Sequence, residues 1–421
     1  MIGRSGKPPR RKPPVAQMNI IFLTLYTYYV YFCIAFNGGA LLPGPQADGL
    51  AFFRAIVPTW EAALVYLIWF AFQALLYLIA PGKIVEGLPL PDGTRLKYRI
   101  NGFSSFIITA AVVALCVWQG WFSLGWIHKN FGALLSAITI FSFVLSLFLY
   151  YYGKLPANQP GKVTGRFVID YFMGTSLNPR VPPVTGFDFK FFCEGRPGMI
   201  GWILLDFVFA GVQYERHGFV SNSMILVCAL QAFYVLHYFW QESFVLSTID
   251  IRTERFGWML VYGDLAWVPM TYCLGAFFLI DHVHSLPFWG ASVILLFNIA
   301  GFYIFRASNL QKDRFKRDPD NVLIWGRKPE SLETKRGTRL LISGFWGKAR
   351  HVNYLGDVMI ALSWALPCLL GSSVPYLQPL WFAFLLIMRE RRDDRWCAQK
   401  YGEDWSRYRE KVPWRIIPHV Y

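Results

Sequence analysis

The chain has 421 residues, of which 55% are hydrophobic, 18% aromatic and only 16% charged, with a formal net charge of +15. A soluble domain usually carries about 25% charged residues, so this composition excludes an ordinary soluble protein and favours an all-α integral membrane protein. The 7 cysteines include no Cys-x-x-Cys pair, so we expect neither a disulfide framework nor a metal site.

The first segment, residues 1–17, is basic and rich in proline, with the sequence RSGKPPRRKPP at positions 4–14. A long apolar run follows it without a small-residue cleavage site. We therefore expect a disordered cytoplasmic tail and not a signal peptide.

Apolar runs of about 20 residues, the length that crosses a bilayer, recur along the rest of the chain. We expect about ten membrane spans in one helical bundle, the last two being short enough to form a re-entrant pair instead. The sequence contains no GxGxxG after a strand, so a Rossmann domain is not expected. The expected spans are 18–37, 60–80, 104–126, 131–152, 198–214, 219–240, 257–280, 283–305, 354–372 and 374–388.

Lys and Arg gather in alternate loops, at 83–99, 154–196, 252–255 and 306–350. The opposite loops hold little beyond Arg54, Lys129 and Arg216. Positive charge collects on the cytoplasmic side of membrane proteins, so both termini are expected in the cytoplasm. This distribution accounts for most of the net charge, and we expect no nucleic-acid partner.

Carboxylates lie within or at the edges of the expected spans, at Asp206, Glu242 and Asp264, close in sequence to Tyr234 and His237. A carboxylate inside a bilayer is costly enough to suggest a function. The alternative is that each pairs with backbone or with an arginine and only holds the bundle together.

The basic loop 306–350 begins with a cluster of cations just outside a span, Arg306, Lys312, Arg314, Lys316 and Arg317. Such a cluster suits anionic lipid head groups or a phosphorylated ligand. Further on, Trp346 lies in the glycine-bracketed sequence GFWG, and Asn353 follows in RHVNY. Glycine, tryptophan and asparagine together suggest a cofactor cradle at the head of a helix, and the alternative is an interfacial turn with a Trp anchor.

Two long segments are similar to known signatures: GRFVIDYFMGTSLNPR at 165–180 and LIMRERRDDRWCAQKYG at 386–402 resemble the two signatures of the sterol reductase family. EGLPLPDGTRLKYRINGF, GDLAWVP and the closing VPWRIIPHVY are also similar to it, so the resemblance covers about residues 41–421. Within the family the chain looks closest to delta-14 sterol reductases. Three positions depart from the family pattern, at Ile169, His237 and Met388.

The resemblance implies reduction of a sterol ring double bond in sterol biosynthesis, with the delta-14 bond preferred and the delta-7 bond as the alternative. An isolated alkene does not accept hydride, so a proton must be delivered first, in a dry pocket. The candidate groups for this proton delivery are Tyr234, Asp393, Asp394 and Glu242.

The resemblance also implies that NADPH is the cofactor and that it binds on the cytoplasmic side. The residues expected to bind it are Lys312, Lys316, Arg317, Leu341, Trp346, Asn353, Tyr354, Asp393, Cys397, Lys400, Tyr401 and Tyr408. The cations among them suit phosphates, and the aromatic rings offer stacking faces.

We divide the chain into the tail, N-terminal transmembrane helices at 18–245, and a catalytic half at 246–421 with the sterol pocket and the NADPH site. The sterol is expected to enter from the bilayer, and membrane lipids are the other expected partners. The membrane would be the endoplasmic reticulum in a eukaryote or the inner or intracytoplasmic membrane in a bacterium.

Two other functions compete with this one. The pattern ARHVNYLGD followed by KYGEDWSRYREKVPWRIIP is also similar to isoprenylcysteine carboxyl methyltransferases, which bind S-adenosylmethionine. A non-enzymatic scaffold like lamin B receptor is the other alternative, although only some seventeen residues precede the first expected span.

Overall fold

The computed structural model describes residues 13–89, 93, 95–155, 163–181 and 187–421. They fall into two compact units, Met1–Val283 and His284–Tyr421. This boundary lies further along the chain than the division at 245/246 drawn from the sequence. Each unit is described by itself.

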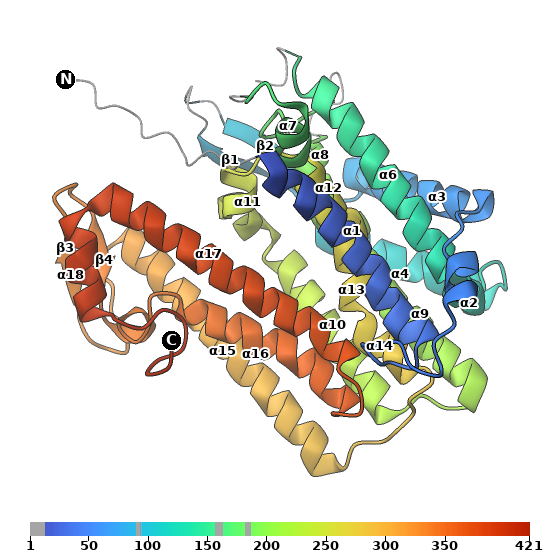
Figure 1. Ribbon diagram of the computed structural model, residues 1–421. Helices are drawn as coiled ribbons and strands as arrows, with labels where there is room; N and C mark the ends of the chain where they lie inside the picture. Colours follow the sequence, from blue (N-terminus) through green and yellow to red (C-terminus); the bar gives the residue numbers. More distant parts are fainter. Residues whose placement is uncertain (1–12, 90–92, 94, 156–162, 182–186) are drawn as a thin grey trace. The chain divides into compact units, whose positions relative to one another are not determined.

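The first unit is helical, and its long helix α9 (Pro197–His217) packs against α5, α8, α10 and α13. The buried face of α9 includes Trp202, Val208 and Phe209, so this helix forms the centre of the unit's core (Figure 1). Its other helices are α1 (Pro13–Phe36), α2 (Gly49–Ala55), α3 (Trp60–Ile79), α4 (Gly102–Trp118), α5 (Leu124–Lys129), α6 (Phe131–Tyr152), α7 (Phe167–Met173), α8 (Phe189–Gly195), α10 (Asn222–Trp240), α11 (Ile249–Arg252), α12 (Trp258–Tyr262), α13 (Val268–Tyr272) and α14 (Leu274–Leu279).

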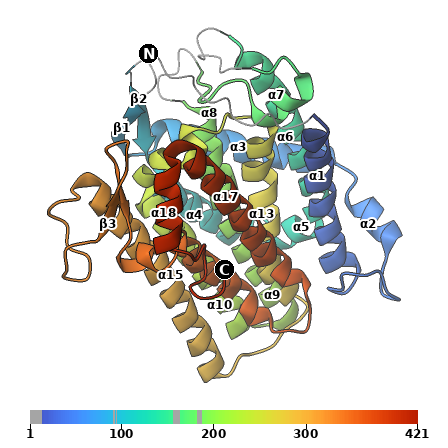
Figure 2. The same cartoon turned by 60° about the vertical axis from the view of Figure 1, so that its left-hand side comes forward.

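The second unit is built on three helices, α15 (Phe288–Arg317), α16 (Val352–Ala365) and α17 (Leu377–Tyr401), with α16 in contact with both others (Figure 1). Figure 2 shows α15 and α17 from another side. Gly301 and Gly356 allow the backbones of α15 and α16 to approach closely, because a Cβ on Gly356 would lie 2.6 Å from the carbonyl oxygen of Gly301. The short helix α18 (Glu403–Lys411) follows α17.

The strands in the described part of the chain form two antiparallel hairpins. One joins β1 (Lys83–Pro89) to β2 (Arg95–Ile100), and the other joins β3 (Ser331–Glu333) to β4 (Arg339–Leu341). Parallel strands, which a Rossmann domain requires, are absent from the described residues.

Six helices in the described residues are long and apolar enough to cross a membrane. They are Ala16–Phe36, Trp60–Ile79, Phe131–Tyr152, Phe189–His217, Asn222–Trp240 and Phe288–Arg317. The expectation of a helical membrane protein is confirmed, but helix length and composition support six spans here and not the ten expected.

The remaining expected spans are shorter or interrupted. The span expected at 104–126 is helical over Gly102–Trp118 and becomes helical again only at Leu124, where α5 begins. The one at 257–280 is divided by the π-helical turn Gly263–Trp267 and by Pro269, which lies at the start of α13. The span at 354–372 leaves α-helical geometry at Leu366, directly before Pro367, because proline removes a backbone donor.

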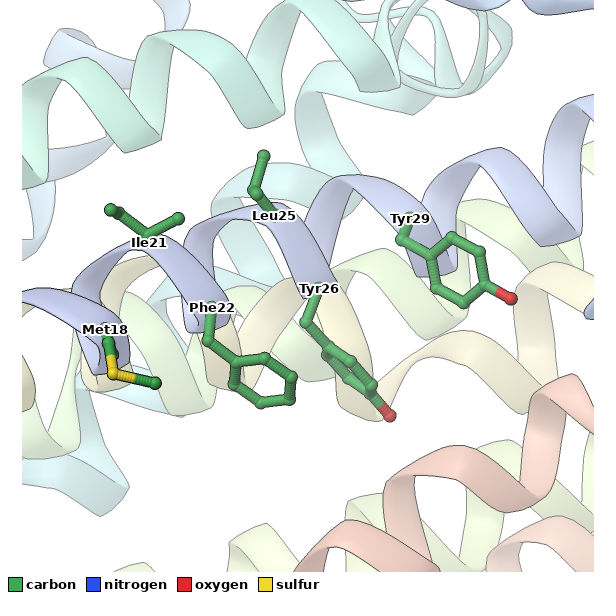
Figure 3. A pocket seen from close by; sticks show the side chains of 6 residues that line it. All are labelled: Met18, Ile21, Phe22, Leu25, Tyr26 and Tyr29. Atoms are coloured by element: carbon green, nitrogen blue, oxygen red, sulfur yellow. The ribbon is translucent and has the colours of Figure 1, made fainter. Parts of the chain in front are cut away.

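The N-terminal region also differs from the expectation. Residues 1–12 of the predicted tail lie outside the described residues, while α1 begins at Pro13, five positions before the expected start at Met18. The outward face of α1 carries Met18, Ile21, Phe22 and Leu25, which line a shallow hollow of about 550 Å³ together with Tyr26 and Tyr29 (Figure 3). An apolar face of this kind fits contact with lipid.

Candidate functional site

All residues expected to bind the cofactor lie in the second unit, on elements that meet near the ends of α15 and α17. We call this set the cradle. Its members are Lys312, Lys316 and Arg317 on α15, Leu341 on β4, Trp346 in the 3-10 turn Gly344–Gly347, Asn353 and Tyr354 on α16, Asp393, Cys397, Lys400 and Tyr401 on α17, and Tyr408 on α18.

Trp346 is the buried centre of the wall between α15 and the turn. Its indole N–H donates to the Ser308 carbonyl at 2.7 Å, and the ammonium of Lys312 lies 3.7 Å from its ring centroid. The backbone N–H of Phe345 donates to Gln311 Oε1 at 3.0 Å, which fixes the turn against α15. Trp346 therefore orients the Lys312 ammonium by a cation–π contact.

The burial of Trp346 distinguishes between the two interpretations of the GFWG sequence, a cofactor cradle and an interfacial turn with a Trp anchor. The side chain is 3% exposed and packs in a cluster with Phe315, Ile324 and Leu341. An interfacial anchor needs an exposed ring, so the interpretation of Trp346 as such an anchor is wrong. Leu341 supplies packing to the same wall.

The other two cations at the end of α15 are solvent-exposed. Arg317 pairs with Asp313 one turn earlier, at 3.1 Å, and Lys316 is exposed beside it. An exposed pair of this kind contributes little stability, so both side chains are available to an anionic ligand.

Asn353 opens α16 with an unsatisfied group. Its Oδ1 is buried and has no hydrogen-bond partner in the described part of the chain. A buried acceptor without a donor is costly, and such a group calls for an explanation. Beside Asn353 in the chain, the rings of His351 and Tyr354 stack with their centroids 4.9 Å apart. The head of α16 therefore offers an acceptor and a stacked aromatic pair.

Neighbouring carboxylates on α17 have different surroundings. Asp394 is buried and accepts from Trp405 Nε1 at 3.0 Å and from Arg409 Nε at 3.1 Å. Burial alone would raise the pKa of Asp394, but the hydrogen bonds from Trp405 and Arg409 outweigh it and hold that pKa below its ordinary value. Asp394 is thus an ionised group that fastens α18 to α17.

The carboxylate of Asp393 has different surroundings from that of Asp394. In the described residues its carboxylate has no hydrogen-bond partner, and burial raises its pKa, an effect that the charges of Arg392, Arg389 and Lys312 oppose. Since the charge of Lys312 on α15 lowers the pKa of Asp393 on α17, the two side chains lie close enough to interact in the cradle. Asp393 is therefore available for a ligand where Asp394 is not.

The far wall of the cradle is formed by α17 and α18. Tyr408 packs in a buried cluster with Trp405 and Val412, and Cys397 lies against it. Burial, with the charge of Asp393 as a smaller cause, raises the pKa of the Cys397 thiol to about 11, so the thiol stays neutral and packs. The ammonium of Lys400 lies 4.8 Å from the ring centroid of Tyr401.

Arg350, the first residue of the RHVNY sequence, is held by the C-terminal segment. Its Nη1 donates to the carbonyls of Val412 and Pro413 at 3.0 and 3.1 Å. The backbone N–H of His351 donates to the Arg415 carbonyl at 2.7 Å. These contacts tie the C-terminal segment beneath the head of α16, and no spacing in the sequence could have indicated them.

The other two catalytic candidates, Tyr234 and Glu242, belong to the first unit. Glu242 is 1% exposed, lies 2.5 Å from Nη2 of Arg196 and accepts from the backbone N–H of Gly102 at 2.8 Å. Arg196 also donates to Asn101 Oδ1 at 2.8 Å. We call Arg196, Glu242, Asn101 and Gly102 the hub, and its geometry is that of the structural pairing considered as an alternative for Glu242.

Tyr234 on α10 lies in an aromatic group with its ring centroid 6.0 Å from that of Trp202. The indole N–H of Trp202 donates to Gln231 Oε1 at 2.8 Å, and Gln231 Nε2 donates to the Tyr272 carbonyl at 3.0 Å. This network fixes the surroundings of Tyr234 within the first unit. Asp206, also on α9, is buried with both carboxylate oxygens unpaired among the described residues.

The signature at 165–180 has a structural role in the first unit. Asp170 accepts hydrogen bonds from the backbone N–H groups of Thr164 and Gly165 at 2.9 and 3.0 Å, which organises the turn before α7. Ile169, which departs from the family pattern, is buried, so an apolar side chain fits that position.

Comparison with known proteins agrees with the resemblance. Residues 18–421 match the model of the Ergosterol biosynthesis ERG4/ERG24 family. The chain is 48% identical over 404 residues to the Delta(14)-sterol reductase of Methylotuvimicrobium alcaliphilum, covering 96% of this chain and 93% of that protein. It is 40% identical to the Delta(14)-sterol reductase of Dictyostelium discoideum, with 94% and 88% covered, and 43% identical to that of Mus musculus, with 88% of each covered.

Proposed function

Because this chain belongs to the Ergosterol biosynthesis ERG4/ERG24 family, we propose that it reduces the delta-14 double bond of a membrane sterol with NADPH. The observation that carries the proposal is the identity of 40% to 48% with proteins named Delta(14)-sterol reductase over 94% to 96% of this chain. The enzyme is an oxidoreductase that acts on a sterol carbon–carbon double bond.

The cradle fits a phosphorylated dinucleotide. Lys312, Lys316 and Arg317 supply cations for phosphates, and Lys400 lies on the opposite helix. The orphaned Oδ1 of Asn353 suits an amide or hydroxyl donor, and the carboxylate of Asp393, near the charges of Arg392, Arg389 and Lys312, could accept from another. NADPH, when bound, supplies a hydride to the sterol.

Proton delivery needs an acid that is not already committed to another charge. Asp394 is ion-paired with Arg409, and Glu242 with Arg196, so both serve as positioning residues in our proposal. Asp393 in the second unit and Tyr234 in the first are the proposed acids. Burial raises the pKa of Asp393, which is the direction that favours a proton donor.

The membrane arrangement follows from the same proposal. We place both termini and the cradle in the cytoplasm, since Lys and Arg gather in the loops of that side. The shorter helices α4 and α16, the interrupted segment α12–α14 and the apolar part of α17 would complete the ten spans. The sterol pocket would lie in 246–421, opening to the bilayer of the endoplasmic reticulum or of a bacterial membrane.

The test is turnover by the purified full chain in detergent with NADPH and separate delta-14, delta-7 and delta-24 sterols. The proposal predicts oxidation of NADPH and loss of the alkene only with the delta-14 sterol. Consumption of the delta-7 sterol alone would move the assignment to the other bond. Binding of S-adenosylmethionine without NADPH oxidation would instead support the methyltransferase alternative.

A further inference from the structure

A short turn in the second unit exposes a tryptophan in a backbone conformation that tryptophan rarely adopts. Ile324 and Arg327 exchange backbone hydrogen bonds of 2.9 and 3.1 Å, so Trp325 and Gly326 form the tip of a two-residue hairpin. Both have positive φ, 52° for Trp325 and 75° for Gly326. Glycine, asparagine and aspartate suit these positions, and a bulky residue there is an outlier that requires an explanation.

The turn is rigidly held and faces outward. Ile324 is buried in the cluster around Trp346, which anchors the turn to the wall of the cradle. Its neighbours Leu323 and Trp325 are 63% and 56% exposed. The turn therefore presents two large apolar side chains to the surroundings from a fixed base.

The position of the turn along α15 shows what those surroundings are. Phe345 contacts Trp325 edge-on, with ring centroids 5.2 Å apart, and also lies 6.0 Å from the ring of Tyr303. Tyr303 is exposed at the end of the apolar part of α15, three residues before Arg306. Tyrosine and tryptophan concentrate at this level of membrane proteins, where hydrocarbon gives way to head groups.

One cation lies near the exposed indole and two more are close to it in the sequence. The ammonium of Lys348 lies 5.9 Å from the Trp325 ring centroid, and Arg327 and Lys328 follow the turn directly. The acidic residues of the same loop are Asp318, Asp320 and Glu330, and Asp320 is paired with Arg339 at 2.5 Å, so the charges next to the indole are those of Arg327, Lys328 and Lys348. Aromatic and aliphatic side chains with adjacent basic residues match an anionic leaflet, which attracts each nearby cation.

We propose that residues 322–328, which we call the Trp325 turn, form a membrane-surface anchor that inserts Leu323 and Trp325 among anionic lipid head groups. This role does not depend on the reaction. It also explains why tryptophan occupies the tip despite its positive φ, because this backbone conformation leaves the indole exposed.

The first experiment places the photo-crosslinking residue p-benzoylphenylalanine at Trp325 in the full chain, reconstituted into vesicles of phosphatidylcholine and phosphatidylglycerol. The matched control carries the probe at Ser406, which is exposed on α18. We expect several-fold more lipid coupled at 325 than at 406, identified by mass spectrometry. Equal coupling at both positions, or coupling at 325 to protein instead of lipid, would overturn the proposal.

The second experiment tests the charge. Changing both Arg327→Gln and Lys328→Gln, with the probe at 325, should lower the ratio of phosphatidylglycerol to phosphatidylcholine labelling by about fivefold for each charge removed. An unchanged ratio would contradict the proposal that Arg327 and Lys328 attract anionic lipid to the turn. Trp325→Asn serves as the folding control, because asparagine accepts positive φ and should keep the turn intact in detergent.

Discussion

The hub of the first unit and the cradle of the second both hold charges away from water, but they treat them differently. In the hub, Arg196 and Glu242 are paired with each other and with Asn101 and Gly102. In the cradle, a buried acceptor on Asn353 and the carboxylate of Asp393 lack hydrogen-bond partners among the described residues. The hub neutralises its two charges within the protein, although Nε and Nη1 of Arg196 also lack hydrogen-bond partners among the described residues, whereas the cradle leaves groups that a ligand could complete.

The largest effect is expected when Glu242 is removed from the hub. Glu242→Ala leaves Arg196 buried without its counter-ion, a change that typically costs about 3–5 kcal/mol. We expect poor yield and a much lower thermal unfolding midpoint in detergent. A Glu242→Ala protein with normal thermal stability but no turnover would instead make Glu242 the acid.

A pair of single changes on α17 separates the two kinds of carboxylate. Asp394→Asn weakens the bonds from Trp405 and Arg409 and should lower stability by about 1.5 kcal/mol, the low value reflecting the partial exposure of Arg409. Asp393→Asn should leave the unfolding midpoint unchanged while reducing turnover. Thermal unfolding and turnover measured on both variants check the comparison, which fails if the two behave alike.

Asn353 offers a change with opposite effects on stability and binding. Asn353→Leu removes a buried acceptor that lacks a donor, so the ligand-free protein should gain about 1 kcal/mol of stability. NADPH affinity should fall in the same variant. If the change lowers stability instead, the Asn353 side chain serves the fold and is not an acceptor kept for a ligand.

The smallest effect near neutral pH concerns His351. Burial, with Lys312 and Arg350 adding to it, lowers the pKa of His351 to about 3. Its unfolded value is about 6.5, so the unfolded chain binds more protons between these values. Stability should be unaffected above pH 6.5 and should fall by up to about 1.4 kcal/mol per pH unit below it.

The control for this pH dependence is His351→Gln, which has no titratable group. We expect the unfolding midpoint of this variant to vary less between pH 6.5 and pH 5 than that of the wild type. Parallel curves for the two proteins would show that His351 is not the group responsible.

The residues that the family resemblance assigned to the cofactor lie on six elements of one unit, namely α15, β4, the turn Gly344–Gly347, α16, α17 and α18, and their role in binding stays a prediction. The sequence did not reveal that α15 continues beyond its apolar part to Arg317, since a charged run resembles a loop. The helix continues because Lys and Arg are good helix formers and Asp313 pairs with Arg317 one turn later.

Hydropathy also did not predict where an apolar segment is interrupted, because backbone geometry and not composition decides this. The segment 257–280 is apolar throughout most of its length, yet the π-helical turn Gly263–Trp267 interrupts it. The burial of Trp346 was equally hidden, because the same residue types form an interfacial anchor at the Trp325 turn and a buried wall at Gly344–Gly347. Only tertiary packing distinguishes the two tryptophans.

The most direct test of the account is the affinity of the purified full chain for NADPH, measured for the wild type, Lys312→Gln and Lys411→Gln. Lys312 lies against Trp346 in the cradle, while Lys411 is exposed at the end of α18. We predict that Lys312→Gln weakens NADPH binding about tenfold or more, as expected for loss of a charge-assisted contact, and that Lys411→Gln leaves it unchanged. Equal affinity of all three proteins, or no binding by the wild type, would contradict the assignment of the cradle.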